Sequence, residues 1–213
     1  MKIIVQILFS KVMVLMSMTG IAGTIDTVGQ EPYEQCGYCH EYDGNSLMGS
    51  YPKLAGQVPG YIKKQLEDFR SGKRKGQMQA TAELLSDADI EFIARYFSAQ
   101  KLKQSTQPPL SKEQQEIANK LYFTGDKARA IQACSNCHGD RAQGIAMFPR
   151  LAGQHAEYLA DQLNAFKAGT RVNDTQGIMQ KISRLLKDAE IESLSEYLSV
   201  ISPSTGAISI DRN

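Results

Sequence analysis

The chain has no cysteine outside two short motifs. Its 4 cysteines lie in the pentapeptides CGYCH, at residues 36–40, and CSNCH, at residues 134–138. No thiol is therefore left for a disulfide that would join distant parts of the fold. The cysteines must act within their own motif, either as a local pair or through a bound group.

Neither sign of charge is in excess. The 213 residues include 24 lysines and arginines against 23 aspartates and glutamates. A protein that binds nucleic acid through its phosphates needs a basic surplus to neutralise them. We therefore expect no nucleic-acid partner.

The sequence also lacks an apolar run long enough for a membrane-spanning helix, which needs roughly 20 residues. The main candidate, at 12–21, is separated by Lys11 from the apolar residues before it, and Lys2 lies near the start. Positive charge, a short apolar run and small residues near Ala22 are typical of a secretory signal. We predict a signal peptide over residues 1–22 and a mature protein in the periplasm. If the segment stayed uncleaved, it would hold the protein at the membrane surface.

The two halves of the chain repeat one another well beyond the cysteines. The matched segments include YPKLAGQ (51–57) with FPRLAGQ (148–154), and LLSDADIEFIARYF (84–97) with LLKDAEIESLSEYL (185–198). Such a repeat indicates a tandem duplication. Between the copies, Pro108 and Pro109 lie in a polar stretch that suits an extended connector. We therefore predict two domains, at residues 23–107 and 108–213.

Each copy has the pattern of a helical domain. Apolar residues recur at three- and four-residue spacing at Ile62, Leu66 and Phe69, and in the matching segment of the second copy. Gly72 and Gly169 follow these segments, where glycine favours the end of a helix. No alternating strand pattern of useful length is present, so the expected fold class is all-α.

Capping residues mark where further helices begin. Ser86 in the first copy and Asp188 in the second predict the N-terminus of a last helix. Ser111 and Gln114 have the spacing of a capping box, which predicts a leading helix for the second copy. In the first copy only a short segment with Pro32 precedes the cysteines, so any leading helix there must be short.

Four kinds of site can use two cysteines spaced as C-x-x-C. A redox-active pair of the thioredoxin type expects a strand and helix context that this chain lacks. A zinc site fits the spacing, but its ligands would come from both copies although each copy repeats a complete motif. A disulfide within each pair suits an exported chain but leaves the following histidine unexplained.

The fourth kind, covalent haem attachment, explains every fixed residue of the motif, because C-x-x-C-H is its sequence signature. The predicted attachment residues are Cys36, Cys39, Cys134 and Cys137, two for each haem. His40 and His138 would then ligate the two irons from one side. We therefore predict two covalently bound haem c groups.

Methionine is the expected ligand on the opposite side of each iron, since its thioether is an accepted sixth ligand. Met78 and Met179 follow their motif histidines by 38 and 41 residues, enough chain to pass round the edge of a haem. Both stand in the local pattern Gly-x-Met-Gln, although their surroundings differ. Met48 and Met147 follow the histidines much sooner and are interpreted as core or surface residues.

A haem with two histidine ligands is a further possibility for one domain only. The chain has 3 histidines, and His155 is the only one outside the motifs. Its counterpart in the first copy is Val58, which cannot ligate iron. We therefore interpret His155 as a surface or capping residue.

These features together resemble the cytochrome c4 family of dihaem, class I c-type cytochromes. The resemblance rests on CGYCH, CSNCH, the two P-[KR]-L-A-G-Q segments and the late methionines, and runs from about Glu31 to Val200. It implies two tandem cytochrome c-like domains related by pseudo-twofold symmetry.

The resemblance also implies roles for individual residues. It assigns His40 and Met78 to one iron, in agreement with the spacing, and His138 and Met179 to the other. It further implies that the backbone carbonyls of Pro52 and Pro149 accept the imidazole N–H of these histidines, which would fix each ring and tune its basicity.

The function implied by the resemblance is electron transfer rather than enzymatic catalysis. Its redox protein partners would be a quinol:cytochrome c oxidoreductase as donor and a terminal oxidase as acceptor. The alternative is a dihaem subunit of a dehydrogenase complex, such as a flavocytochrome sulfide dehydrogenase. A dihaem peroxidase would need an open or displaceable sixth site on iron, and a methionine in each copy argues against it.

Overall fold

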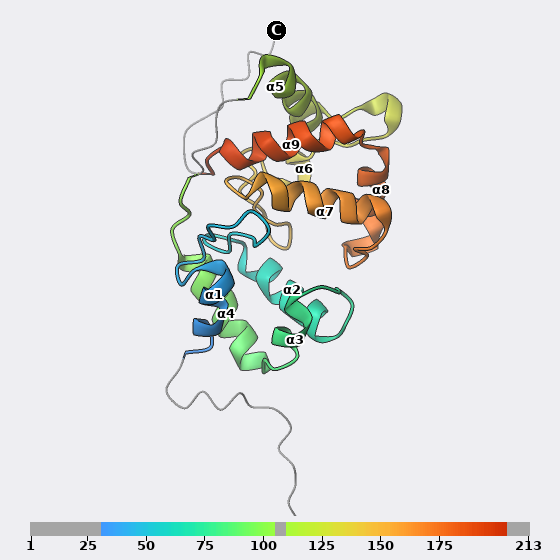
Figure 1. Ribbon diagram of the computed structural model, residues 1–213. Coiled ribbons are helices and arrows are strands. Elements are labelled where there is room, and N and C mark those ends of the chain that lie inside the picture. Colours follow the sequence, from blue (N-terminus) through green and yellow to red (C-terminus); the bar gives the residue numbers. More distant parts are fainter. Residues whose placement is uncertain (1–30, 105–109, 204–213) are drawn as a thin grey trace, which may run out of the picture.

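The computed structural model describes residues 31–104 and 110–203, which form two helical domains (Figure 1). The predicted signal peptide at 1–22 and the domain boundary at Pro108 lie outside these residues. Within them no strand forms, and only isolated bridges join Asp126 to Ile131 and Ile145 to Phe148. The expected all-α fold class is confirmed.

The first domain, blue to green in Figure 1, is built around two long helices. Its elements are η1 (Glu34–Cys36), α1 (Gly37–His40), α2 (Pro59–Arg70), α3 (Met78–Ala82) and α4 (Asp87–Ala99). Helix α2 packs against both α3 and α4. Its apolar face, with Ile62 and Leu66, meets Ile90, Ile93 and Phe97 of α4 in one buried core.

The second domain has the same order of main helices and one addition at its start. Its elements are α5 (Lys112–Asn119), η2 (Lys120–Thr124), η3 (Lys127–Arg129), α6 (Ser135–His138), α7 (Ala156–Ala168), η4 (Thr175–Gly177), α8 (Ile178–Leu185) and α9 (Asp188–Val200). Helix α7 packs against α8 and α9, and α5 covers another face of α9. The core of this domain is separate from that of the first.

The sequence signals for helix ends are mostly confirmed. Gly169, after α7, adopts a φ of 73°, and Gly72, two residues after α2, a φ of 72°. Ser86 and Ser111 both form capping boxes. The expectation that Asp188 caps α9 is wrong by one residue, since the helix begins at Asp188 and Lys187 precedes it as N-cap.

The first domain lacks a counterpart of α5 among its described residues. From Glu31 onward, the only element ahead of α1 is the short turn η1, which ends at Cys36. Instead, the ring of Tyr33 stacks on that of Tyr96 in α4, with centroids 3.7 Å apart, and lies 6.2 Å from that of Phe92. In the first domain, the side chain of Tyr33 thus covers part of one face of α4. In the second domain, helix α5 covers the corresponding face of α9.

Reciprocal hydrogen bonds join the two domains and express their pseudo-twofold relation. The side-chain oxygen of Gln57 accepts from the backbone N–H of Arg150 at 2.7 Å, and that of Gln154 accepts from Lys53 at 2.7 Å. The two glutamine amides donate back to the carbonyls of Arg150 and Lys53, each at 3.0 Å. Gln57 and Gln154 end the two repeated LAGQ segments, and Lys53 and Arg150 directly precede them. The four residues therefore occupy two pairs of matching positions in the repeat.

Candidate functional site

One continuous cavity of about 1320 Å³ extends across both domains. Both C-x-x-C-H motifs face it, as do the two late methionines; the lining includes Cys36, Cys39, His40, Met78, Cys134, Cys137, His138 and Met179. Pockets for a single small ligand usually measure roughly 300–1,000 Å³. The cavity is therefore large enough for more than one bound group.

Each motif forms a single helical turn that holds its histidine inside the domain. His40 ends α1 and His138 ends α6, and both side chains are buried. The Nδ1 atom of His40 lies 2.9 Å from the carbonyl oxygen of Pro52, and that of His138 lies 3.0 Å from the carbonyl of Pro149. If Nδ1 carries the proton, Nε2 keeps its lone pair free for a metal.

Burial keeps these histidines neutral. It lowers the pKa of both imidazoles from the ordinary value, and the bonds to Pro52 and Pro149 only partly oppose the change. A neutral imidazole is the form that binds a metal ion. The rings are therefore in the right state to ligate iron.

The four cysteines are unpaired thiols. Burial raises the pKa of the Cys36 thiol to about 11 and that of the Cys134 thiol to about 11, which disfavours their thiolate forms. No cluster of three or more His, Cys, Asp or Glu side chains suited to a metal ion occurs in the described ranges. The structure thus gives no support to the local disulfides or to the shared zinc site.

Each late methionine lies in the first turn of a helix. Met78 is the first residue of α3 and packs against the first core, and Met179 is the second residue of α8. The preceding glycines, Gly76 and Gly177, have φ values of 147° and 67°, which favour glycine. The Gly-x-Met-Gln pattern therefore marks a sharp turn that leads into each methionine helix.

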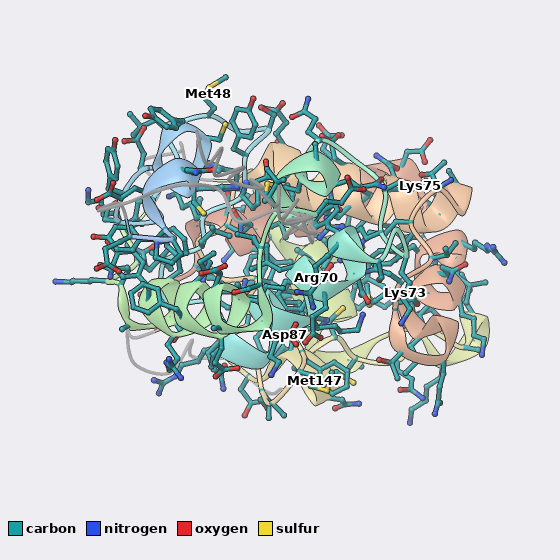
Figure 2. All side chains as sticks on the ribbon, turned by 90° about the horizontal axis from the view of Figure 1, so that it is seen from below. Met48, Arg70, Lys73, Lys75, Asp87 and Met147 are labelled. Atoms are coloured by element: carbon teal, nitrogen blue, oxygen red, sulfur yellow. The ribbon has the colours of Figure 1, made fainter. Side chains whose placement is uncertain are left out.

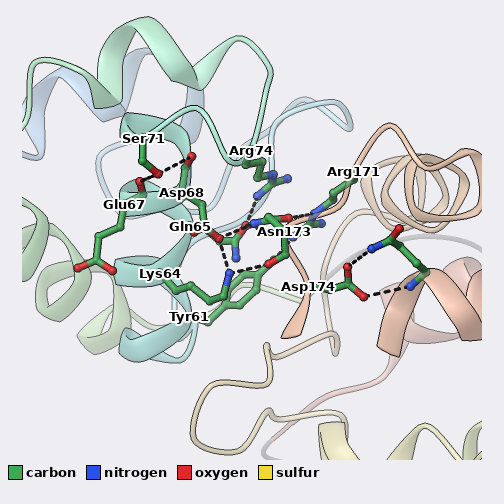
Figure 3. Close-up of polar contacts among 11 residues, drawn as sticks. Tyr61, Lys64, Gln65, Glu67, Asp68, Ser71, Arg74, Arg171, Asn173 and Asp174 are labelled. Carbon is green, nitrogen blue, oxygen red and sulfur yellow. Dashed lines mark hydrogen bonds and ion pairs between the residues drawn. The ribbon is translucent and has the colours of Figure 1, made fainter. Parts of the chain in front are cut away.

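A carboxylate fixes the start of the second of these helices. Asp174 accepts hydrogen bonds from the backbone N–H of Gln180, at 3.1 Å, and from its side-chain amide, at 2.7 Å (Figure 3). Gln180 is the residue after Met179. The aspartate thus holds the backbone that presents the methionine to the cavity.

The remaining candidates have other surroundings. Met48 is 58% exposed and Met147 is 54% exposed, although Met147 also borders the cavity. His155 precedes α7, and its Nε2 lies 2.8 Å from the carbonyl oxygen of Ser46 in the other domain. It is therefore an interdomain contact, which its local sequence does not reveal.

Sequence reasoning missed a buried arginine on the cavity wall. Arg150 is 2% exposed, and its guanidinium donates to the carbonyls of Ala152, Lys53 and Ala55. Its Nε atom is buried without a partner, and burial lowers the pKa of the guanidinium to about 10. Burial and the nearby Arg150 also lower the pKa of Lys53. Neither cation contacts a carboxylate in residues 31–104 and 110–203, so a bound anionic group would be stabilised beside them.

A second group of cations crosses the domain boundary (Figure 3). Arg74 stacks over the ring of Phe69 and donates to the phenol of Tyr158 in the other domain, at 3.1 Å. Arg171 stacks over Phe166 in the same way and donates to Tyr61, at 3.0 Å.

A carboxylate lies beside these arginines. It belongs to Asp68, which contacts Lys64 and accepts from Asn173 at 2.7 Å. The sequence repeat shows that Tyr61 matches Tyr158 and that Arg74 matches Arg171. It does not show that each arginine side chain reaches the tyrosine of the other domain. The cluster therefore carries surplus positive charge beside the cavity.

Comparison with known proteins identifies the family. A family model described as "Cytochrome c" matches residues 118–202, and one described as "Cytochrome C oxidase, cbb3-type, subunit III" matches residues 27–97. A protein of Pseudomonas aeruginosa named cytochrome c4 is 39% identical, over 90% of this chain and 96% of its own. The chain belongs to the cytochrome c4 family.

Further relatives agree with this assignment. A crystal structure of reduced recombinant cytochrome c4 from Pseudomonas stutzeri superposes with a TM-score of 0.74 at 37% identity, and the match covers 80% of this chain and 95% of that one. A Stutzerimonas stutzeri protein named thiosulfate dehydrogenase electron acceptor is 38% identical over 76% of each chain. As a member of the cytochrome c4 family, the protein carries two covalently bound haem c groups and is not an enzyme.

The residues around the cavity fit two such groups. A haem c carries two propionate carboxylates, and the cavity wall offers cations that lack carboxylate partners. The unpartnered Nε of Arg150 is the clearest sign of this complementarity. The four motif cysteines, which form no disulfide, would attach the two groups, and the neutral imidazoles would ligate the irons.

Proposed function

We propose that this member of the cytochrome c4 family passes single electrons between redox proteins through two iron centres, one in each domain. The proposed attachment residues are Cys36, Cys39, Cys134 and Cys137. The proposed iron ligands are His40 and Met78 in the first domain and His138 and Met179 in the second. The observation that carries the proposal is the shared cavity, because both motifs and both methionines line it.

Each haem supplies a one-electron iron centre when bound. In the proposal, the carbonyls of Pro52 and Pro149 would orient the imidazoles of His40 and His138, and Met78 and Met179 would complete the ligation of each iron. A methionine bound at the sixth ligand position would keep water and peroxide from the iron. A peroxidase, in contrast, needs that position open or easily vacated. If both ligands stayed in place on oxidation, little of the protein would have to move.

We further propose domains at residues 23–107 and 108–213 in a periplasmic protein whose signal peptide covers residues 1–22. The two family matches, at 27–97 and 118–202, each fall within one proposed domain and support the division. Within the described residues, no helix is long and apolar enough to cross a membrane.

The proposed route runs from a quinol-oxidising complex to a terminal oxidase. A second route has support from the relative named thiosulfate dehydrogenase electron acceptor, which points to a dehydrogenase as donor. Sequence identity is similar for relatives of both kinds, at 38–39%. The donor must therefore be tested directly.

A redox titration combined with donor assays tests the proposal. The purified protein should accept two electrons, one for each haem, and pass both to an oxidised acceptor cytochrome. Reduction by a quinol-oxidising complex, but not by a thiosulfate dehydrogenase, would establish the first route, and the reverse would establish the second. Rapid turnover of hydrogen peroxide would contradict the carrier function altogether.

A further inference from the structure

The segment around the first attachment motif has unusually many exposed apolar side chains. Tyr38 is 81% exposed, Leu47 is 83%, Met48 is 58% and Tyr42 is 54%. All four come from residues 37–48, which we call the first attachment loop. Cys39 of the same loop is also exposed, whereas its counterpart Cys137 is partly buried. The edge of a group bound to Cys39 would therefore lie at the surface here.

The packing of the loop leaves these side chains pointing outward. The ring of Tyr42 lies against Gly37. The backbone carbonyl of Tyr42 accepts a hydrogen bond from the Tyr96 hydroxyl at 2.9 Å. The hydroxyl of Ser46 closes the turn before Met48, accepting from its N–H at 3.2 Å. The loop is thus a fixed surface rather than an unstructured one. Figure 2 shows Met48 projecting from one edge of the molecule, with Met147 near the opposite edge.

The charge around this loop is acidic. From Glu31 to Pro52 the sequence contains 4 acidic residues and no lysine or arginine. Asp43 forms an ion pair with Lys103 at 2.6 Å. Lys101, which is also exposed, lies in the same segment after α4. The other three, Glu31, Glu34 and Glu41, form no ion pair within the described residues.

The matching segment of the second domain differs in charge. From Arg129 to Pro149 it contains 2 arginines and a single acidic residue. Arg129 is paired with Asp126 and Glu190, which leaves Arg141 and Asp140 to balance one another. Its exposed apolar residues are Ile145, Met147 and Phe148, at 49%, 54% and 37%. Two copies of one fold therefore present different surfaces at the same place, although the chain as a whole is almost neutral.

We propose that the first attachment loop is the docking surface for a redox protein whose own cofactor edge is surrounded by lysines and arginines. The exposed tyrosines, Leu47 and Met48 form the apolar centre of the contact, and the three unpaired glutamates form its rim. Opposite charge on the two rims steers the proteins together and disfavours acidic partners. This inference rests on the proposed function and specifies which domain meets the basic partner.

Electron transfer to a lysine-rich single-haem cytochrome c is the test, measured by stopped flow with the intact dihaem protein. The double variant Glu34→Lys, Glu41→Lys should lower the second-order rate constant at low ionic strength by about tenfold or more, because it reverses the rim charge. The matched control is Glu113→Lys, Glu116→Lys, which makes the same change in net charge at exposed sites on α5. Equal rate losses in both variants would overturn the proposal.

The apolar centre is tested separately. Tyr38→Ser with Leu47→Ser removes two side chains that are more than four-fifths exposed, so the fold should not change. The rate constant should fall several-fold, while Ile145→Ser with Met147→Ser in the second domain should have little effect. The opposite pattern, or self-association through the loop in sedimentation, would overturn the proposal.

Reduction by ascorbate separates this inference from the proposed function. If ascorbate reduces both haems and the probe reacts through the second domain, only the docking surface is wrong. If the haems do not exchange electrons with any carrier, the proposed function itself fails.

Discussion

Arg74 donates a hydrogen bond to the phenol of Tyr158, 3.1 Å away in the other domain, and Arg171 makes the reciprocal bond to Tyr61. Each domain therefore completes its polar site with a side chain from the other. The reciprocal glutamine contacts of Gln57 with Arg150 reinforce the same boundary. The two domains should consequently behave as one structural unit.

Removing a glutamine at this boundary should destabilise the protein. In Gln57→Leu, the buried backbone N–H and carbonyl of Arg150 both lose their partner. Each unsatisfied group costs about 1–3 kcal/mol, and denaturant unfolding should reveal this as a lower midpoint. Gln115→Leu, at an exposed position on α5, is the control. An equal midpoint in the two variants would show that the contact contributes nothing.

Acid should remove a specific contribution to stability in the second domain. Burial tends to raise the pKa of Glu190, but hydrogen bonds from Arg129, at 2.7 and 3.0 Å, outweigh it and leave the pKa below its ordinary value of 4.5. A carboxylate with a lowered pKa stabilises the fold above its ordinary pKa, and this stabilisation is lost as pH falls through the folded value.

Glu190→Gln should therefore be less stable than the native protein at pH 7, and the difference should shrink as the pH falls below the ordinary pKa of 4.5 and through the lower folded value. Thermal unfolding at a series of pH values measures this. Glu192→Gln changes an exposed residue of the same helix and serves as control. A difference for Glu190→Gln that stays constant down to pH 3 would contradict the account.

The stacking of Tyr33 on α4 predicts a weak point in the first domain. Tyr33→Ala should lower stability by about 0.5–1.5 kcal/mol beyond the loss of buried area, since aromatic pairs contribute this much. Hydrogen exchange should show faster opening of α4 than of α9, which α5 covers. Equal protection of the two helices in the variant would contradict this interpretation.

Local patterns predicted most of the fold. The repeat, the helix periodicity and the capping boxes at Ser86 and Ser111 depend on residues a few positions apart, so one sequence suffices to find them. The cap at Lys187 was missed because a lysine gives no capping signal. At the site, the motif itself indicated haem, and the Gly-x-Met-Gln pattern selected the methionines.

Contacts between domains were not predictable in the same way. The roles of Arg150, Arg171 and His155 depend on how the two copies face each other, and the spacing within one copy carries no information on that. The repeat showed that such positions are paired, but only the assembled structure shows which residues meet. The surplus cations beside the cavity belong to this class.

The oxidised visible spectrum of methionine variants tests the central claim most directly. With two covalent haems per chain, Met78→Ala and Met179→Ala should each remove half of the far-red band that reports iron–methionine bonding. Met48→Ala and Met147→Ala, at exposed positions, should leave the band intact. A full band in either Met78→Ala or Met179→Ala would contradict the proposed pair of histidine–methionine centres.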